Sequence, residues 1–229
     1  MKNQYFGDIN DFRKYGLLRI FSELYKEILI VWMLTHNDDK NSKNKDGRKI
    51  HYLNHPKKYR DNDPILFDEL CKLMTKDRNI KLIEQSEIMK SFNFVSEFLS
   101  DDKVTRENYF KNVFELSKDN NLVFFDPDNG IEVKSCKYGQ KKSSKYIYWN
   151  EIKTVWDLNK DILLYQHFIR ENHDVYIKRI VESCKNVLPS ANVIPIVTTN
   201  VLFLYITKNN GKQLEQILKN KWNEEIKVV

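Results

Sequence analysis

The chain has 229 residues, of which 41% are hydrophobic and 13% aromatic, so we expect one sizeable core and a single domain over residues 1–229. No apolar run reaches the 18 residues of a membrane span, and the N-terminus lacks the apolar core of a signal peptide. Three widely spaced cysteines argue against a disulfide framework and a zinc site. We therefore expect a cytoplasmic protein with no membrane partner.

The positive charge is concentrated in two polar stretches. Residues 37–60 contain eight lysines and arginines against three aspartates, and residues 133–146 contain five lysines and no acid. Since the whole chain carries +6, the remainder carries about −4 (6 minus 10). Basic segments of this kind bind polyanions, although any lysine-rich solvated loop has the same composition. We expect both stretches to be loop insertions, and nucleic acid, either DNA or RNA, to be the partner.

The predicted elements alternate between helices and strands. In chain order the patterns predict a helix over 8–27, a strand over 28–35, a polar loop, a short strand over 49–53, a helix over 63–76, a strand over 79–84, helices over 86–99 and 105–118, and a strand over 121–126. There follow a short strand or the start of a helix over 145–152, a strand over 161–166, a helix over 171–186, strands over 193–197 and 201–207, and a helix over 211–222. Asp8 is expected to cap the first helix, and Pro64 to occupy the first position of the helix over 63–76.

This alternation predicts an α/β fold of the Rossmann-like type. The sheet is expected to be mostly parallel, with helices on both faces and a C-terminal antiparallel β-hairpin. In such open sheets, ligands bind outside the carboxyl ends of the strands. Three predicted strands end in polar side chains, at residues 34–39, 125–130 and 165–170, and the basic stretches follow two of these ends. The sequence therefore predicts that acids, a histidine and a positive rim share one edge of the sheet.

The segment FDPDNG, residues 125–130, ends a fully apolar strand. Pro127 fixes the turn, and Gly130 permits a close approach of the backbone to a ligand. Asp126 stands at the strand end, where its carboxylate can accept a hydrogen bond or act as a base. The same residue types also form ordinary turns. Because a turn needs no pair of carboxylates, we interpret Asp126, Asp128 and Asn129 as catalytic candidates.

His167 is a fourth catalytic candidate, because a histidine at a strand end can exchange protons near neutral pH. The alternative is a histidine held by hydrogen bonds in a structural role. Nucleic-acid-binding candidates are the basic residues near the predicted edge: Lys14, Lys141, Lys142, Lys145 and Arg170.

The N-terminal segment GDINDFRK brings further charges to the first predicted helix. Asp11 and Lys14 are three residues apart and can pair on one helical face. The alternative is a capped helix on the surface. His36 with Asp38 and Asp39 is a weak candidate for a metal cluster, and we expect no metal.

In the order of these motifs the chain resembles the bacterial ribosomal RNA adenine methyltransferases of the RlmJ kind. That family opens with a Gly-Asn…Asp…Lys segment in a helix, for which this chain has GDINDFRK, and has a strand that ends in Thr-His, here Thr35 and His36. A later strand of the family ends in Asp-Pro-Pro-Tyr, where this chain has FDPDNG. The resemblance implies a methyltransferase-like fold, methylation of a base, and S-adenosylmethionine as cofactor near Asp11, His36 and Glu84, the last on the ribose.

The chain departs from the family pattern at two places. The family's glycine-rich cofactor loop is replaced by NDDKNSKNKDG, which contains one glycine, Gly47. Side chains then stand where the backbone approaches the cofactor. The aromatic residue of the Asp-Pro-Pro-Tyr motif is replaced by Asn129. The cofactor pocket and the base pocket are therefore both altered.

Base methylation is the leading hypothesis from the sequence, and three further hypotheses stay open. The same carboxylates suit hydrolysis of an N-glycosidic bond, with Asp126 or Asp128 orienting a water and His167 stabilising the leaving base. Such a DNA glycosylase would take a base out of its stack and attack foreign or modified DNA, as in phage defence. A nuclease is the next hypothesis, and a non-catalytic nucleic-acid-binding protein is the last. A binding-only protein predicts that Asp126 and His167 are replaceable without loss of activity.

Overall fold

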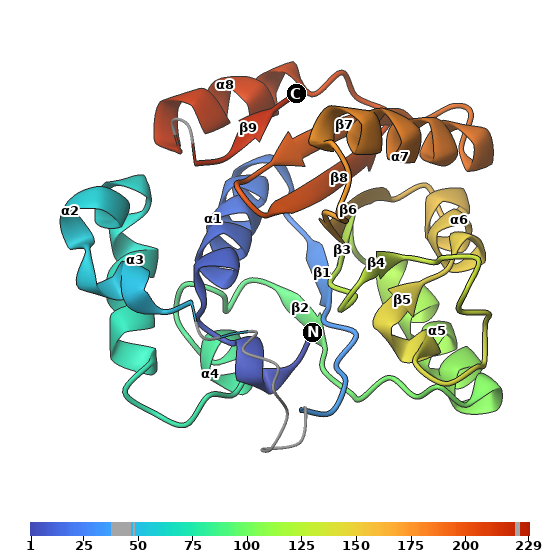
Figure 1. Ribbon diagram of the computed structural model, residues 1–229, viewed down its shortest axis with the longest axis horizontal. Coiled ribbons are helices and arrows are strands. Elements are labelled where there is room, and N and C mark those ends of the chain that lie inside the picture. Colours follow the sequence, from blue (N-terminus) through green and yellow to red (C-terminus); the bar gives the residue numbers. More distant parts are fainter. Residues whose placement is uncertain (38–46, 48, 223–224) are drawn as a thin grey trace.

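The computed structural model describes residues 1–37, 47, 49–222 and 225–229 (Figure 1). Its strands are β1 (Ile28–Val31), β2 (Asn93–Val95), β3 (Leu122–Phe125), β4 (Gly130–Ile131), β5 (Tyr146–Ile147), β6 (Asp161–His167), β7 (Asn192–Val197), β8 (Val201–Thr207) and β9 (Lys227–Val228). Its α-helices are α1 (Ile9–Leu24), α2 (Pro56–Tyr59), α3 (Pro64–Leu73), α4 (Lys81–Glu84), α5 (Lys103–Ser117), α6 (Trp149–Asp157), α7 (His173–Val187) and α8 (Lys212–Lys221). Short 3₁₀ helices are η1 (Asn3–Tyr5), η2 (His51–Asn54), η3 (Arg60–Asn62) and η4 (Ser143–Lys145).

The main sheet has seven strands in the order β2-β1-β3-β6-β8-β7-β9. Strands β2, β1, β3 and β6 are parallel, and β8 pairs antiparallel with both β6 and β7. The predicted α/β fold with a mostly parallel sheet is thereby confirmed. After β1 the chain forms β2 on one side of β1 and then returns to form β3 on its other side, so the direction of strand addition reverses at β1. Crevices at such reversals are the usual ligand sites of open parallel sheets.

Both faces of the sheet are buried, as the continuous apolar runs predict. In β1, Ile28 and Ile30 join one core cluster, whose helical residues come mainly from α1, α3 and α8. Leu29 and Val31 face the other cluster, with residues from α5, α6 and α7. Figure 1 shows α1, α3 and α8 on one side of the strands and α5 and α6 on the other. This two-sided packing fixes the carboxyl ends of β1, β3 and β6 at one edge.

Two helix starts agree with the sequence. Asp8 caps α1 by accepting hydrogen bonds from the backbone N–H groups of Asn10 and Asp11. Pro64 occupies the first turn of α3, where its missing N–H is not needed. These caps place Asp8 and Asp11 in the first turn of α1, facing the carboxyl edge of the sheet.

Three sequence-based assignments are wrong. Residues 79–84 form a turn and helix α4 instead of a strand, because Ile80 and Ile83 are buried at helical spacing. The segment 86–99, predicted helical, consists of turns followed by the edge strand β2. The spacing of its buried residues Met89, Phe92 and Leu99 resembles that of a helix. The end of this segment is nevertheless a strand, because β2 pairs with β1.

The third error is the short strand over 49–53, which is the 3₁₀ helix η2 leading into Pro56 of α2. The sequence missed β4, which forms a two-residue parallel ladder with β5 in which Gly130 pairs with Tyr146 and Ile131 with Ile147. A pattern of two residues carries no periodicity, so β4 had no sequence signal. The segment 145–152, predicted as a short strand or the start of a helix, contains both, since β5 is followed by the start of α6.

Candidate active site

A cavity of about 460 Å³ opens at the carboxyl edge of the sheet. Its wall comes from the N-terminal segment, the first turn of α1, the segment after β3, the end of β6 and the turn between β7 and β8. The lining residues are Met1, Tyr5, Asp8, Asn10, Asp11, Lys14, Gly47, Lys49, Asp126, Pro127, Asp128, Asn129, Tyr165, His167 and Asn200. Segments that are far apart in the sequence therefore converge on one crevice, as the polar strand ends predicted.

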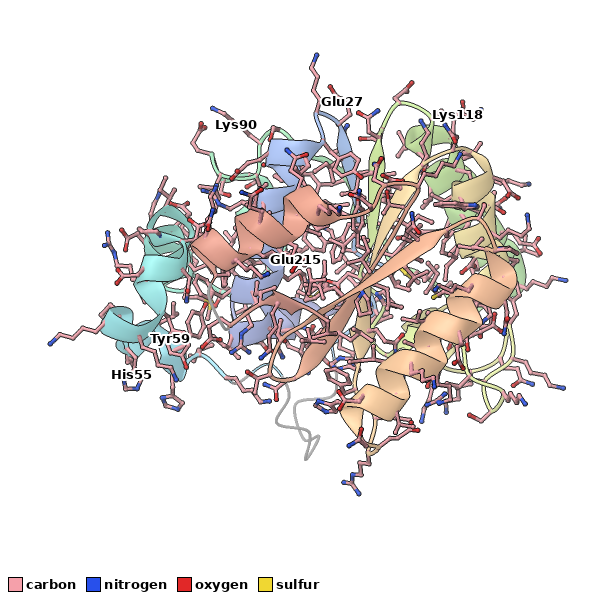
Figure 2. All side chains as sticks on the ribbon, turned by 90° about the horizontal axis from the view of Figure 1, so that it is seen from above. Glu27, His55, Tyr59, Lys90, Lys118 and Glu215 are labelled. Atoms are coloured by element: carbon pink, nitrogen blue, oxygen red, sulfur yellow. The ribbon has the colours of Figure 1, made fainter. Side chains whose placement is uncertain are left out.

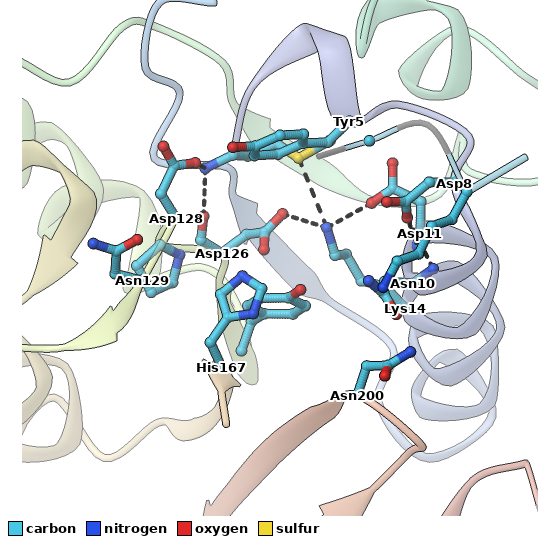
Figure 3. Close-up of a pocket in the computed structure, with 15 residues that line it drawn as sticks. Tyr5, Asp8, Asn10, Asp11, Lys14, Asp126, Asp128, Asn129, His167 and Asn200 are labelled. Carbon is cyan, nitrogen blue, oxygen red and sulfur yellow. Dashed lines mark hydrogen bonds and ion pairs between the residues drawn. The ribbon is translucent and has the colours of Figure 1, made fainter. Parts of the chain in front are cut away.

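Lys14 joins the two sides of the cavity. Its Nζ lies 2.8 Å from Asp11 Oδ1 and 2.7 Å from Asp126 Oδ2, and Figure 3 shows the lysine between these acids. Lys14 is only 3% exposed. Burial alone lowers the pKa of Lys14, but the two carboxylates raise it above its ordinary value. The lysine is therefore a fixed cation over the neutral range.

The first turn of α1 supplies a carboxyl group of a different character. Oδ1 of Asp8 accepts hydrogen bonds from the backbone of Asn10 and Asp11, at 2.8 and 3.0 Å. Burial, with a smaller contribution from the charge of Asp11, raises the pKa of Asp8 to about 6. A carboxyl group with this pKa is partly protonated near neutral pH and can deliver a proton.

Asp11 has a mainly structural set of partners. Its Oδ2 accepts hydrogen bonds from Gly7 N at 3.0 Å and from Tyr15 Oη at 2.9 Å, while its Oδ1 holds Lys14. All of these groups are buried or nearly so, which makes the carboxylate an orienting group for Lys14. Asp11, predicted as a cofactor contact, lines the same cavity as Asp126.

The DPDNG segment forms the opposite wall. Burial raises the pKa of Asp126 above its ordinary value, while Lys14 and the N-terminal ammonium act to lower it. For Asp128 the balance is reversed. Burial again raises the pKa, but the Met1 ammonium at 2.7 Å and a hydrogen bond from Thr35 Oγ1 at 2.7 Å lower it below the ordinary value. Adjacent carboxyl groups of one turn thus sit in unlike environments.

A glutamine that sequence reasoning missed holds this turn in place. Gln166 Oε1 accepts a hydrogen bond from Ile131 N at 2.8 Å, and its Nε2 donates to Tyr176 Oη at 2.7 Å. Gly130 has φ +99°, and a Cβ on it would lie 2.2 Å from Gln166 Oε1. The glycine is required because Gln166 occupies the space of a side chain. Asn129 then lies fixed at the cavity wall, with its N–H donating to Lys145 O at 2.9 Å.

His167 and two residues that were not predicted complete the wall. His167 ends β6 and packs edge-on against the ring of Tyr165, with centroids 5.0 Å apart. Lys14 Nζ lies 5.0 Å from the centroid of the same tyrosine ring. Asn200 reaches the cavity from the turn after β7. No local pattern marks Tyr165 or Asn200 as site residues, because only the sheet order brings them to Asp126.

Two predicted cofactor contacts lie elsewhere. Glu84 follows a helical turn instead of a strand, and its Oε1 accepts hydrogen bonds from Trp32 Nε1 at 2.8 Å and from Ser96 Oγ at 2.6 Å. His36 is exposed and stacks on Phe98 with centroids 4.4 Å apart. Neither is among the described residues that line the cavity. Asp38 and Asp39, considered as metal ligands beside His36, fall outside the described residues.

The predicted phosphate contacts separate into two groups. Lys14 is buried in the cavity and bound to acids. Lys141 and Lys142 are exposed and Lys145 is half-buried, all three in the segment between β4 and β5, while Arg170 is exposed after β6. Lys14 is therefore positioned for charge stabilisation inside the site, and the others are positioned on the surface.

Neither a metal cluster nor a membrane-spanning helix is found in the described part of the chain. Over residues 1–37, 47, 49–222 and 225–229, no group of three or more histidine, cysteine, aspartate or glutamate residues could hold a metal ion. Among the helices described there, none is both long and apolar enough to cross a membrane.

Comparisons with known proteins place the chain in no family. A scan against protein families, a search of curated proteins and a search of solved structures each found no match.

Proposed function

We propose that the protein hydrolyses the N-glycosidic bond between a nucleobase and its sugar. The observation that carries the proposal is the set of unlike carboxyl groups on one cavity. Asp126 is held by the buried cation Lys14 at 2.7 Å, and Asp8, which lines the same cavity from the opposite wall, has its pKa raised to about 6. A carboxylate paired with a fixed cation, together with a second carboxyl group that can give a proton, is the equipment of glycoside cleavage.

The roles follow from these environments. As the bond between the base and C1′ breaks, the sugar becomes an oxocarbenium-like cation, which the Asp126 carboxylate stabilises. Asp8 gives its proton to the departing base, which leaves with the electron pair of the broken bond. Water then adds to C1′ and loses a proton to a carboxylate, so the products are the free base and a sugar with a hydroxyl group at C1′. Lys14 keeps one oxygen of Asp126 oriented throughout.

The remaining wall residues suit recognition of a base. Asn129 and Asn200 offer carboxamides, which donate and accept hydrogen bonds to base edges. Tyr165 and His167 provide ring surfaces, and His167 can exchange a proton with the leaving base. A volume of about 460 Å³ lies in the range of pockets for small organic ligands.

Methyl transfer is a second candidate, and the strand order supports it. The sheet has four parallel strands, β2, β1, β3 and β6, followed by β8 and β7, which pair antiparallel. The resemblance to adenine methyltransferases implies a mixed sheet of this kind with a C-terminal hairpin. The residues at the end of β1 do not fit S-adenosylmethionine. The Met1 ammonium donates a hydrogen bond to Met33 O at 3.3 Å, and Thr35 N donates one to Met1 O at 2.9 Å, so Met1 occupies the space at the end of β1. Glu84 accepts a hydrogen bond from Trp32 Nε1. We therefore place methyl transfer second.

Release of free bases tests the proposal. The purified protein is incubated with deoxynucleosides and with oligonucleotides that contain the four normal bases or modified ones such as 5-hydroxymethylcytosine, and free bases are measured by chromatography with mass detection. The proposal expects one or more bases to be released, and release to require Asp126. Calorimetric titration with S-adenosylmethionine addresses the second candidate, since micromolar binding with no base released would reverse the order of the two. Broken strands without free base would indicate a nuclease.

A further inference from the structure

A rigid, positively charged loop begins at the cavity wall. We call residues 133–145, between β4 and β5, the basic loop. It starts three residues after Gly130, the last residue of the DPDNG segment, and its final residue, Lys145, accepts a hydrogen bond from the cavity residue Asn129. Figure 1 shows β4 and β5 beside the main sheet, close to α5. The loop is therefore attached to the site at both of its ends.

A fully buried arginine holds the loop in one conformation. Arg106, from α5, donates to Ser143 O at 3.0 Å and Tyr146 O at 2.7 Å, and pairs with Glu151 at 2.7 Å. Its guanidinium also lies 4.8 Å from the ring centroid of Tyr148. Because Arg106 is fully buried and binds several partners at once, its guanidinium is held in one position. The backbone carbonyls of Ser143 and Tyr146 that it binds are therefore fixed as well.

An acid outside the loop fixes the same segment from the other side. The Asp101 carboxylate accepts hydrogen bonds from Lys142 N at 2.7 Å and Ser144 N at 2.8 Å. These backbone bonds, together with those from the Ser143 hydroxyl, lower the pKa of Asp101 against the raising effect of burial. The Asp101 carboxylate thus binds the loop backbone, and none of the described ion pairs joins it to a lysine of the loop.

The exposed lysines of this loop carry charge that no acid neutralises in the described structure. Lys134, Lys137, Lys141 and Lys142 are exposed, and within the described chain none of the four pairs with an acid. Some exposed lysines elsewhere pair with an acid three or four residues away, as the ion pairs of Lys72, Lys90, Lys118, Lys153 and Lys219 show. Other exposed lysines among the described residues also lack an ion pair, so the distinguishing feature of the loop is its fixed backbone beside the cavity. Lys90 and Lys118 point away from the ribbon at the periphery of the molecule (Figure 2). A fixed backbone with unneutralised cations is a surface prepared for an anionic partner.

We infer that the basic loop binds the phosphate backbone of DNA and thereby presents a base of that DNA to the cavity. The inference rests on the proposed function, because it makes the substrate a polymer instead of a free nucleoside. The cavity is lined by four aspartates, and two of its cations, Lys14 and the Met1 ammonium, are already paired with these acids. The lining therefore favours a base over a phosphate, and the basic loop, which is attached to the cavity wall through Asn129, offers positive surface outside it. DNA is favoured over RNA because the 2′-hydroxyl of ribose withdraws electrons and destabilises the oxocarbenium ion that Asp126 would face.

Two variants with equal change of charge test the inference. The loop variant replaces Lys134, Lys137, Lys141 and Lys142 by glutamine. The matched control replaces Lys72, Lys90, Lys118 and Lys153 by glutamine, so that both proteins have a net charge of +2 (6 minus 4). Affinity for a fluorescent 20-nucleotide DNA, single-stranded and duplex, is measured by anisotropy between 50 and 300 mM salt, and thermal unfolding checks that both variants are folded.

The loop variant is expected to bind DNA at least about 30-fold more weakly at low salt, and its slope of log affinity against log salt to fall by about 3, since each lost phosphate contact removes roughly 0.7–0.9. The control is expected to stay within about threefold of the unmodified protein, because its lysines are engaged with acids. Equal weakening in both variants would overturn the inference, since only net charge would then matter. Tighter loop-dependent binding of a matched RNA would overturn the choice of DNA.

Base release separates this inference from the proposed function. If free deoxynucleosides are cleaved as fast as DNA and the loop variant loses no activity on DNA, the polymer inference fails while the hydrolytic function stands. If DNA binding depends on the loop but no base is ever released, the interface stands and the proposed function fails.

Discussion

Arg106 and Lys14 are both buried cations paired with carboxylates, but of these two pairs only that of Lys14 borders the cavity. Arg106 is 0% exposed, and its partners Glu151, Ser143 and Tyr146 account for its donors on every side. Lys14 is 3% exposed and equally well paired, yet its partner Asp126 forms part of the wall of a 460 Å³ cavity. The first pair holds a loop and a helix together. The second keeps a charged carboxylate oriented toward a space that a substrate can enter.

Burial of an ion pair does not by itself identify a functional site. Burial raises the pKa of Glu151, and Arg106 lowers it again, as happens at Asp126 with Lys14. What distinguishes the cavity is a second carboxyl group, Asp8, with a pKa of about 6 and no cation in direct contact among the described residues. Access and unequal carboxyl groups together favour chemistry.

The largest expected effect is that of removing the charge at Asp126. Asp126→Asn keeps the shape of the side chain, and Lys14 retains Asp11 as a partner, so we expect a folded protein. Base release should fall by about a thousandfold, in the range observed when acid–base or charge-stabilising groups are lost. The matched control is Asp157→Asn, an exposed aspartate on α6, which should change the rate by less than about twofold. Undiminished activity in Asp126→Asn would support the binding-only hypothesis.

The buried ion pair of Arg106 and Glu151 should contribute to the stability of the protein. Arg106→Gln leaves Glu151 buried without its cation, and the free energy of unfolding should fall by about 3–5 kcal/mol. Urea denaturation measures this. The double variant Arg106→Met with Glu151→Leu should recover part of the loss, because no buried charge then lacks a partner. A loss below about 1 kcal/mol in the single variant would contradict the structural role assigned to this pair.

The rate of base release in the cavity should depend on pH. Because protonated Asp8 is the proposed acid and its pKa is about 6, the rate of base release should fall tenfold for each pH unit above about 6. Asp8→Asn should be slower than the unmodified protein at pH 6 and should lose this slope. A rate that is flat from pH 6 to 8 in the unmodified protein would exclude Asp8 as the acid.

The same carboxyl group makes a stability prediction. The folded pKa of Asp8 is raised from 3.8, so its contribution to stability is complete below about pH 4 and is lost as pH rises through about 6. Asparagine caps a helix as well as aspartate does and carries no charge. At pH 8, Asp8→Asn should therefore be more stable than the unmodified protein by about 1–2 kcal/mol, measured by denaturation.

The smallest effect on the rate of base release is expected at the turn that carries Asp126 and Asn129. Gly130→Ala forces a Cβ toward Gln166 Oε1 at a φ of +99°, at a cost of about 1–3 kcal/mol. Because the displaced turn carries Asp126 and Asn129, base release should fall by about tenfold with little change in the pH profile. Gly139→Ala, at a φ of +76° where the nearest atom is 3.4 Å away, is the control for backbone strain without a clash.

Much of this site could be predicted from the sequence, because the rule that polar strand ends meet at one edge of a parallel sheet needs only the strands to be found. It brought together Asp126, Asp128, Asn129 and His167 from their places after apolar runs. The pairing of Asp11 with Lys14 followed from helical spacing.

The rest depends on tertiary structure. Gln166 and Tyr165 lie inside β6, where a strand pattern marks only burial, and Asn200 belongs to a turn whose place depends on the order of β8 and β7. Glu84 was assigned to a cofactor because the apolar residues around it were interpreted as a strand, although their spacing of three is helical. The partner of Lys14 across the cavity, 112 residues away, has no local signal at all.

One reaction tests the central claim most directly. The protein is incubated with DNA and with S-adenosylmethionine labelled at its methyl group, and four quantities are measured together: free base, abasic sites, strand breaks before alkali, and label in the DNA. The account predicts free base and abasic sites in equal amounts, intact strands and unlabelled DNA, and none of these products with Asp126→Asn. Label in the DNA without free base, or breaks without abasic sites, would contradict it.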